Sequence, residues 1–193
     1  EFTLFGQIII LSLIQIGGLG FMTFAVFIIS LFEKKLSWKQ RIMMKESSKS
    51  SSYENLSTLA FHILLIATFF EGCSTFLLTV HWSSQLGWWP AFYSALFHSI
   101  SAFNNAGFSL WDQNLLLFVG DPIVNLAITS LIIIGGLGFP VIIDLAKKRR
   151  LDRLTLHSKI VLTTTTILIV VGWFILLLLE HDNPGTMGEL HAG

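Results

Sequence analysis

The sequence predicts an all-α integral membrane protein, built from tandem units of helix, re-entrant hairpin and helix. Three observations lead to this fold class: an apolar composition, four apolar runs long enough to cross a bilayer, and an internal repeat. Of the 193 residues, 53% are hydrophobic and 12% are charged, and the mean hydropathy is +0.71. A soluble domain carries about 25% charged residues. We therefore expect lipid to be the main solvent and a nucleic-acid-binding function to be excluded.

Four apolar runs reach the roughly 20 residues that a transmembrane helix needs. They are Phe2–Phe32, Leu56–Val80, Pro122–Ile143 and Ile160–Leu179. All twelve Lys and Arg residues fall in two windows, at 34–49 and 147–159. Because cytoplasmic loops are enriched in Lys and Arg, we expect residues 33–55 and 147–159 to be cytoplasmic and residues 81–121 to be extracellular or re-entrant.

The segment between the second and third runs contains a short apolar stretch that has to return to the outer side. Residues 91–103 are too few to cross the membrane, and the sequence Asn-Asn-Ala-Gly-Phe follows them at 104–108. These five residues are called the NNAGF segment below. The pattern predicts a short helix that enters from outside and turns at the NNAGF segment, which then lines a cavity or pore. An extracellular loop with a hydrophobic helix on the membrane surface is the alternative.

A repeat with an offset of 118 residues relates the two halves of the chain. The pentapeptide Gly-Gly-Leu-Gly-Phe occurs at 17–21 and again at 135–139, and the residues at 36–42 align with those at 154–160. Units repeated in one orientation pack around an axis along the membrane normal. The pentapeptides lie inside apolar runs and follow no strand, which excludes a nucleotide-binding loop.

The glycines of the repeat are expected to allow close helix packing, with a mechanical hinge as the alternative. The residues concerned are Gly17, Gly18, Gly20, Gly135, Gly136 and Gly138, and Pro140 is expected to kink its helix.

The NNAGF segment has the chemistry of a monovalent-cation site. The C-terminus of the preceding helix carries about half a negative charge, and no Asp or Glu occurs between Gly72 and Trp111. Backbone carbonyls are the remaining ligands that could replace an ion's hydration shell. Gly107 and the two asparagines tolerate the unusual backbone angles that direct successive carbonyls to one side.

Three stretches carry a family resemblance: FHSISAFNNAGFSLW at 97–111, the two GGLGF pentapeptides, and NPGTMGEL at 183–190. Together they resemble the Trk/Ktr/HKT superfamily of potassium transporters, and in particular the KtrB- and TrkH-type membrane subunits of bacteria. Proteins of this superfamily carry four M1–P–M2 units, each consisting of a helix, a pore hairpin and a helix. The likeness extends over essentially the whole chain.

The resemblance implies potassium uptake across the cell membrane through a selectivity filter of backbone carbonyls. The filter residues are then Asn104, Asn105, Ala106, Gly107 and Phe108. Residues 1–32 become the last helix of the first unit, 56–146 the whole second unit, and 160–193 the first helix and the start of the outer loop of the third unit. The chain is accordingly expected to be a fragment that does not conduct alone.

The partners implied by the resemblance are membrane lipid, the remaining pore units, a second copy in a homodimer, and a cytosolic nucleotide-binding regulatory subunit of the KtrA/TrkA type. Potassium is the expected ion, with sodium as the alternative for a pore of the same fold. We expect no organic cofactor, no nucleic acid and no metal site beyond the filter.

A secondary transporter is the main alternative, whereas a purely structural membrane subunit would not need the NNAGF segment. A secondary transporter with a broken helix would use Asn104 and Asn105 to bind a small substrate. An intramembrane enzyme would need a Ser/His, Asp/Asp or metal pair at membrane depth, and the sequence offers none, so no enzymatic activity is expected.

Individual polar residues have simpler interpretations. Glu71 and Glu180 occupy equivalent places in the repeat and are expected to bond to loop backbone, with a direct ion site as the alternative. His98 is expected to be a packed, hydrogen-bonded residue because no second ligand lies at metal-binding spacing. Asp112 and Asp121 either attract cations or are solvated loop acids. Cys73 is expected to be buried and inert.

The tryptophans at 82, 88, 89 and 111 fit an aromatic belt at the outer membrane interface or packing against the short helix.

Overall fold

The computed structural model describes residues 3–34 and 56–181. Most of the basic loop predicted at 33–55 and the NPGTMGEL stretch at 183–190 lie outside these residues. The described residues form helices, with no strand among them. The chain divides into two compact units, Glu1–Gly136 and Leu137–Gly193, which are described separately.

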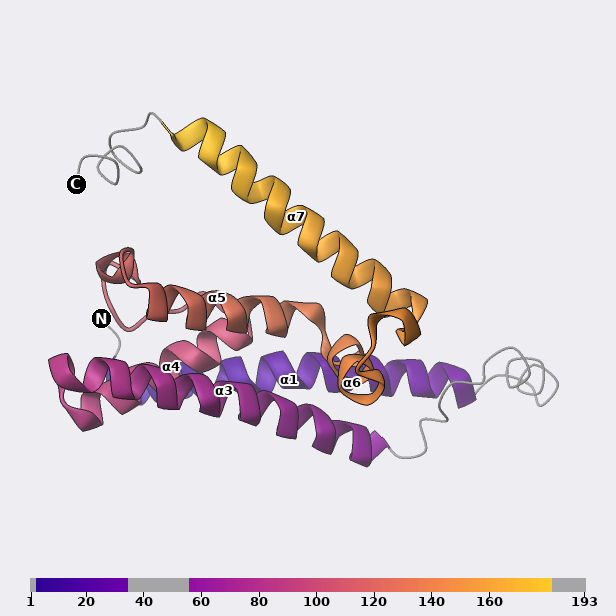
Figure 1. Cartoon of the computed structure of the whole chain (residues 1–193). Helices are drawn as coiled ribbons and strands as arrows, with labels where there is room; N and C mark the ends of the chain where they lie inside the picture. Colours follow the sequence, from indigo (N-terminus) through magenta and orange to yellow (C-terminus); the bar gives the residue numbers. More distant parts are fainter. Residues whose placement is uncertain (1–2, 35–55, 182–193) are drawn as a thin grey trace. The chain divides into compact units, whose positions relative to one another are not determined.

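The first unit contains the helices α1 (Leu4–Lys34), α3 (Leu56–Leu86), α4 (Trp88–Phe103) and α5 (Pro122–Leu137), the last of which ends at the boundary between the units. A short 3₁₀ turn, η1 (Leu116–Phe118), precedes α5. Gly87, with φ 81°, is the single residue between α3 and α4. A positive φ favours glycine, and here it turns the chain so that α4 packs back along α3 (Figure 1).

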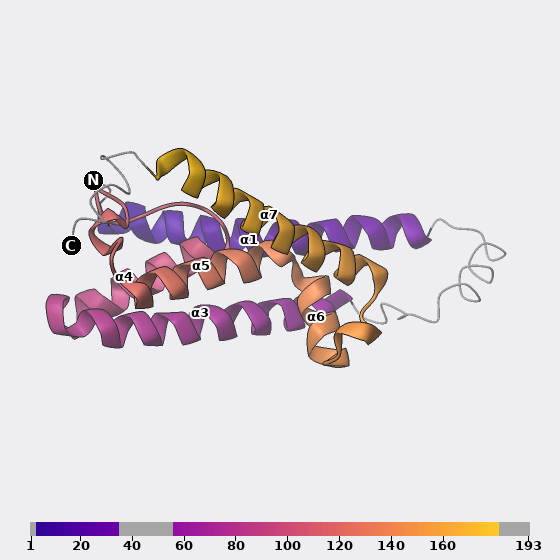
Figure 2. The same ribbon diagram turned by 45° about the horizontal axis from the view of Figure 1, so that its top comes forward.

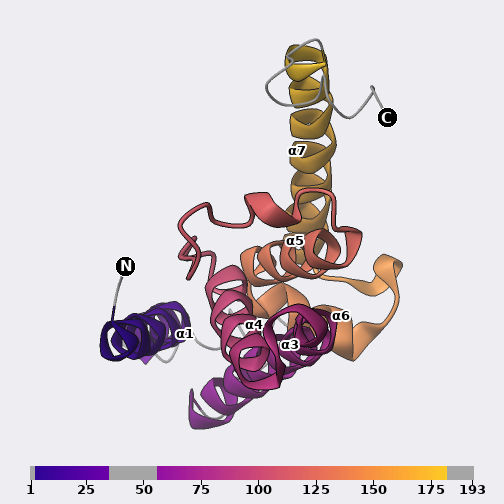
Figure 3. The same ribbon diagram turned by 90° about the vertical axis from the view of Figure 1, so that its left-hand side faces the viewer.

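Helix α4 is the most enclosed element of the first unit. Figures 2 and 3 show it lying against α3, with α1 and α5 on other sides of it. Ten of its sixteen residues are buried, and all seven residues from Phe97 to Phe103 are among them. By contrast, the apolar side chains of α3 that face away from α4 are exposed, among them Phe69 and Phe76. Such exposed apolar faces are what lipid or further helices cover.

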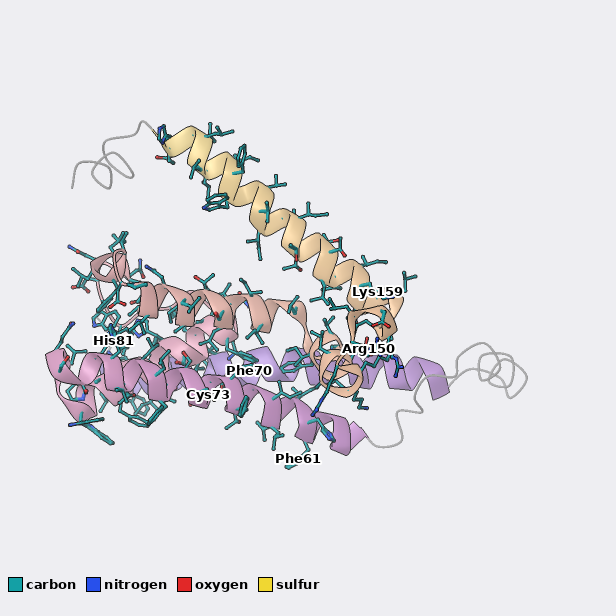
Figure 4. The ribbon with its side chains drawn as sticks, viewed as in Figure 1. Phe61, Phe70, Cys73, His81, Arg150 and Lys159 are labelled. Atoms are coloured by element: carbon teal, nitrogen blue, oxygen red, sulfur yellow. The ribbon has the colours of Figure 1, made fainter. Side chains whose placement is uncertain are left out.

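Cys73 lies on this exposed side of α3 (Figure 4). The prediction that Cys73 is buried is therefore wrong. The apolar run around it does not place it inside, because a helix surrounded by lipid is hydrophobic on its outer face too.

The second unit consists of α6 (Phe139–Lys148), the 3₁₀ turn η2 (Leu151–Arg153) and α7 (Leu156–Glu180). Asp144 organises the connection between its two α-helices. The Asp144 carboxylate accepts hydrogen bonds from Thr155 N at 2.8 Å and Ser158 Oγ at 2.7 Å, and it pairs with Lys148 at 2.8 Å. Thr155 in turn is the N-cap of α7. Arg150 lies in this connection and Lys159 in the first turn of α7 (Figure 4).

The helix predicted at 122–143 is broken into α5 and α6, two residues before the kink that was predicted at Pro140. The interruption lies at Gly138, which has φ 82° and ψ 146°, and Pro140 stands in the first turn of the new helix α6. Proline is well accommodated there because the first turn has no intrahelical partners for its N–H groups.

Two described helices are long and apolar enough to cross a membrane, Phe61–Leu86 within α3 and Leu156–Glu180. The broken pair α5 and α6 adds a third if it is counted as one span, and Leu4–Gly18 of α1 is a shorter apolar stretch.

Candidate ion-binding hairpin

The NNAGF segment begins where α4 ends, and its backbone N–H groups fold back onto that helix end. Asn105 N donates to Ala102 O at 3.1 Å, and Ala106 N donates to Ser101 O at 2.8 Å. Asn105 has φ 54° and Gly107 has φ 72°. Left-handed backbone is open to glycine and tolerated by asparagine, so the sequence at these two positions matches the turn that the chain makes.

The direction of the N–H groups fixes the direction of the carbonyls. The peptide bonds of the described residues are all trans, and in a trans peptide the C=O of one residue points opposite to the N–H of the next. Asn105 N, Ala106 N and Phe108 N all donate to groups of α4. The carbonyls of residues 104, 105 and 107 therefore point away from α4.

Phe108 ends the segment differently. Its N–H donates to Ser101 Oγ at 2.9 Å, and its carbonyl accepts from the same hydroxyl at 2.7 Å. The Phe108 carbonyl is thus turned toward α4, while those of residues 104, 105 and 107 are turned away from it.

The Asn104 side chain is directed into the protein. Its Nδ2 donates to Gln15 Oε1 at 3.1 Å, to Glu71 Oε1 at 3.2 Å and to Ile100 O at 2.9 Å. The neighbouring Asn105 amide lies 3.4 Å from Ile132 O and 3.5 Å from Phe103 O. Both amides are therefore engaged with protein groups.

Two of the predicted packing glycines lie directly against this hairpin. A Cβ on Gly18 would come within 1.9 Å of Asn104 Oδ1, and a Cβ on Gly135 within 1.8 Å of Phe103 O. Gly136 has only an ordinary contact, at 3.9 Å from Asn105 Nδ2, whereas Gly17 and Gly20 have nothing within 4 Å among the described residues. Among the described residues, one glycine of each pentapeptide therefore packs closely against the hairpin, and Gly138 lies at the helix break.

A cavity of about 330 Å³ adjoins the NNAGF segment. Its lining includes Asn105, Gly107 and Phe108 of the segment and Ile128 and Ile132 of α5. The segment is therefore reachable from an open space in the first unit.

His98 holds the loop that follows α4 against this helix, as predicted for a packed histidine. Its Nδ1 lies 2.7 Å from Ser94 O and its Nε2 lies 3.0 Å from Ser109 Oγ. The ring stacks on Trp111 with centroids 4.3 Å apart. Trp82 packs edge-on against both rings.

The four tryptophans divide into two groups. Trp82 is fully buried and Trp111 packs on His98, whereas Trp88 and Trp89 are exposed by 69% and 77%. Only the last two suit an interfacial aromatic belt.

The acidic residues are held by specific partners. Glu71 is buried and bonds to side-chain amides, rather than to loop backbone as expected.

Asp121 Oδ1 accepts from Ile123 N and Val124 N at the start of α5, and its Oδ2 lies 2.5 Å from His81 Nε2. The hydrogen bond from His81 holds the pKa of Asp121 below its usual range. Asp121 is therefore a helix cap, which neither sequence interpretation foresaw.

Two contacts of α1 were not predicted from the sequence. Gln15 joins α1 to the hairpin, and Gln7 accepts a hydrogen bond from Tyr93 of α4 at 2.9 Å. The available signal was their place within a charge-free apolar run, because polar side chains in membrane helices usually face other helices. Within residues 3–34 and 56–181, no group of three His, Cys, Asp or Glu residues is placed to hold a metal ion.

The chain is similar to known cation transport proteins. The TrkH family, described as "Cation transport protein", matches residues 3–181. The Ktr system potassium uptake protein B of Bacillus subtilis (strain 168) is 45% identical over 191 residues, covering 99% of this chain and 43% of that protein. The protein of the same name from Vibrio alginolyticus is 41% identical, covering 100% of this chain and 43% of that protein.

A third relative is the potassium/sodium uptake protein NtpJ of Enterococcus hirae, which is 35% identical over 82% of this chain and 35% of its own length. The chain thus spans less than half the length of these relatives. Their names describe uptake proteins and not enzymes. The chain belongs to the TrkH family of cation transport proteins and is a multi-pass protein of the plasma membrane.

Proposed function

We propose that this chain forms part of a potassium uptake pathway, in which the carbonyls of the NNAGF segment coordinate the dehydrated ion. The relatives named as potassium uptake proteins support potassium as the transported ion. The observation that carries the proposal is the backbone direction: the N–H groups of residues 105, 106 and 108 face α4, so the carbonyls of residues 104, 105 and 107 face away. Carbonyls directed together replace a hydration shell.

Electrostatics favour the same assignment. The C-terminus of α4 leads into the segment and brings about half a negative charge. The NNAGF segment itself carries no formal charge, which suits a monovalent cation better than a hard divalent one. Phe108, with its carbonyl held by Ser101, anchors the end of the filter in this proposal.

The proposal places a complete M1–P–M2 unit at 56–146: α3 as M1, α4 with the NNAGF segment as P, and the broken pair α5 and α6 as M2. Residues 1–32 are then the last helix of a preceding unit, and residues 160–193 begin a following one. Loops 33–55 and 147–159 face the cytoplasm. The pore is completed by the other units of the protein, and the assembly is a homodimer with a cytosolic nucleotide-binding regulatory subunit.

A sodium-permeable pore is the second candidate, because NtpJ is named as a potassium/sodium uptake protein. A secondary transporter that binds a substrate through Asn104 and Asn105 is less well supported, because both side-chain amides already bond to protein groups.

The test is growth on low potassium of a bacterium that lacks its own potassium uptake and expresses the complete protein. Gly107→Ser puts a side chain at φ 72°, where no atom of the described residues lies within 4 Å of the new Cβ, so within this chain the expected local effect is backbone strain. Gly120→Ser is the matched control, because Gly120 also has open space and no positive φ.

We expect the wild-type and Gly120→Ser proteins to restore growth, and Gly107→Ser, although inserted, to fail or to admit sodium. If Gly107→Ser restores growth as well as the wild type, the filter assignment is wrong. If the wild type itself does not restore growth, potassium uptake is not the function.

A further inference from the structure

A closed ring of three side chains lies beside the start of the NNAGF segment. Gln15 of α1 donates from Nε2 to Glu71 Oε2 at 3.0 Å, and Asn104 Nδ2 donates to Glu71 Oε1 at 3.2 Å and to Gln15 Oε1 at 3.1 Å. Glu71 is 5% exposed. The ring joins three segments that are 33 to 89 residues apart in the sequence.

The donors and acceptors of this ring are not interchangeable. Both oxygens of Glu71 face N–H donors, so this position needs a group that accepts twice, as only a carboxylate does among similar side chains. Gln15 must accept with one end and donate with the other. Asn104 uses the same Nδ2 toward Gln15, Glu71 and Ile100 O.

The ring holds the backbone as well as the side chains. The bond from Asn104 Nδ2 to Ile100 O closes the Asn104 side chain onto the last turn of α4. Gly18 of α1 lies so close that a Cβ there would be 1.9 Å from Asn104 Oδ1. Asn104 is therefore fixed from one side by the surface of α1 and from the other by Glu71 of α3, directly before the left-handed Asn105.

We propose that Glu71 and Gln15 are positioning residues that hold Asn104 in place and thereby set the preference of the filter for potassium over sodium. This inference rests on the proposed function. When Asn104, the first residue of the segment, is held in place, the carbonyls that follow keep one spacing. When Asn104 is loosened, these carbonyls can close around a smaller ion. Neither residue touches the ion in this account.

The donor pattern supplies a specific test. In Glu71→Gln, the new side chain has one oxygen and one NH₂ group where Glu71 had two oxygens. Its NH₂ group therefore faces another donor, either Gln15 Nε2 or Asn104 Nδ2, with no acceptor between them. Adding Gln15→Glu to that variant restores the pattern with the roles exchanged. The new carboxylate at position 15 accepts from the amide at position 71 and from Asn104, while the amide oxygen at position 71 accepts from Asn104. Gln15→Leu removes the bridge without replacing it.

The experiment measures potassium and sodium uptake by the complete protein in proteoliposomes, together with its melting temperature in detergent. Loss of a hydrogen bond to a charged group corresponds to about tenfold or more in an equilibrium. We therefore expect Glu71→Gln and Gln15→Leu to lower the potassium-over-sodium preference by about tenfold, and Glu71→Gln combined with Gln15→Glu to return it to near the wild-type value.

Gln7→Leu is the matched control, because Gln7 is an amide on the same helix that accepts a hydrogen bond from Tyr93 and is not a member of the ring. It should leave the selectivity unchanged. Unchanged selectivity in both single variants overturns the inference, as does a double variant that is no better than Glu71→Gln.

If a single variant does not accumulate in the membrane, the double variant decides. One that accumulates and selects potassium supports the inference, and one that fails to accumulate, or accumulates without selectivity, contradicts it. A wild-type protein that moves neither cation overturns the proposed function instead, and that result is distinct from every outcome above.

Discussion

The Ser101 hydroxyl bonds to both backbone polar groups of Phe108: it accepts from the N–H at 2.9 Å and donates to the carbonyl at 2.7 Å. Ser101 is 3% exposed in the last turn of α4, whereas Phe108 begins the return of the chain from the NNAGF segment. One side chain therefore closes the far end of the segment, and the ring of Gln15, Glu71 and Asn104 closes the near end.

Replacing Ser101 with Ala should loosen the far end. Two backbone groups of Phe108 lose their partner; an unpaired buried polar group costs about 1–3 kcal/mol, and these part-buried groups should cost less. We expect a lower melting temperature and weaker potassium uptake. Ser83→Ala is the control, since the Ser83 hydroxyl donates within its own helix, to Val80 O at 2.8 Å. Equal melting temperatures for both variants would show that Ser101 does not anchor Phe108.

Replacing Gly135 with Ala should separate α5 from the end of α4. The new Cβ would meet the backbone oxygen of Phe103 at 1.8 Å, a contact that a side-chain rotation cannot relieve. Overpacking of this kind costs about 1–3 kcal/mol or more. Gly136→Ala, whose Cβ would have only a 3.9 Å contact, should behave like the wild type. The yield of folded protein after detergent extraction compares the two, and equal yields contradict the close packing.

Replacing His98 with Ala should detach the loop at 104–121 from α4. The variant loses the bond to Ser109 Oγ and the stacking on Trp111, and it leaves a cavity in a buried cluster. We expect a loss of about 2–4 kcal/mol, measured as a fall in melting temperature and as faster proteolysis between residues 109 and 121. Ser109→Ala removes one bond without a cavity, and its effect should be smaller. A larger effect for Ser109→Ala would contradict this account.

Asp121 should make the stability depend on pH in the acidic range. Its pKa is lower in the folded protein than its ordinary value, first because of the hydrogen bond to His81. A lowered pKa means that the ionised group favours folding above the unfolded value of about 3.9, and that this contribution is lost as the pH falls through the folded value.

The melting temperature of the wild type should therefore exceed that of Asp121→Ala at neutral pH, and the difference should close below about pH 4. Asp112→Ala, at an exposed acid of the same loop, serves as the comparison. A difference between wild type and Asp121→Ala that stays constant down to about pH 3 would contradict the role of the ionised cap.

The sequence predicted the positions of the long helices well, because an apolar run of the required length indicates a membrane helix directly. The end of α4 at Phe103 and the start of α5 at Pro122 agree with the predicted boundaries, since amides, glycine and proline mark them. The break at Gly138 was not predicted. The same pentapeptide passes through an unbroken helix at Gly20, and the difference is the residue two positions later: Met22 in α1 and Pro140 in the second copy. Proline cannot donate to the preceding turn, so the helix has to restart.

The contacts around the NNAGF segment could not be read from the sequence. Gln15 and Asn104 are 89 residues apart, and nothing in the local pattern of either indicates the other. Which glycine of each pentapeptide packs against the hairpin, Gly18 in one and Gly135 in the other, also depends on how each helix approaches it. Such pairings follow from helix packing in three dimensions, whereas the sequence specifies only which residues are small or polar.

The central claim is that the carbonyls of the NNAGF segment bind a monovalent cation. The most direct measurement is the position of rubidium, an anomalously scattering substitute for potassium, in crystals of the complete protein. We predict an anomalous peak coordinated by the carbonyl oxygens of Asn104, Asn105 and Gly107, which disappears when sodium replaces rubidium. A rubidium peak elsewhere in the pore, with none at these carbonyls, would contradict the claim.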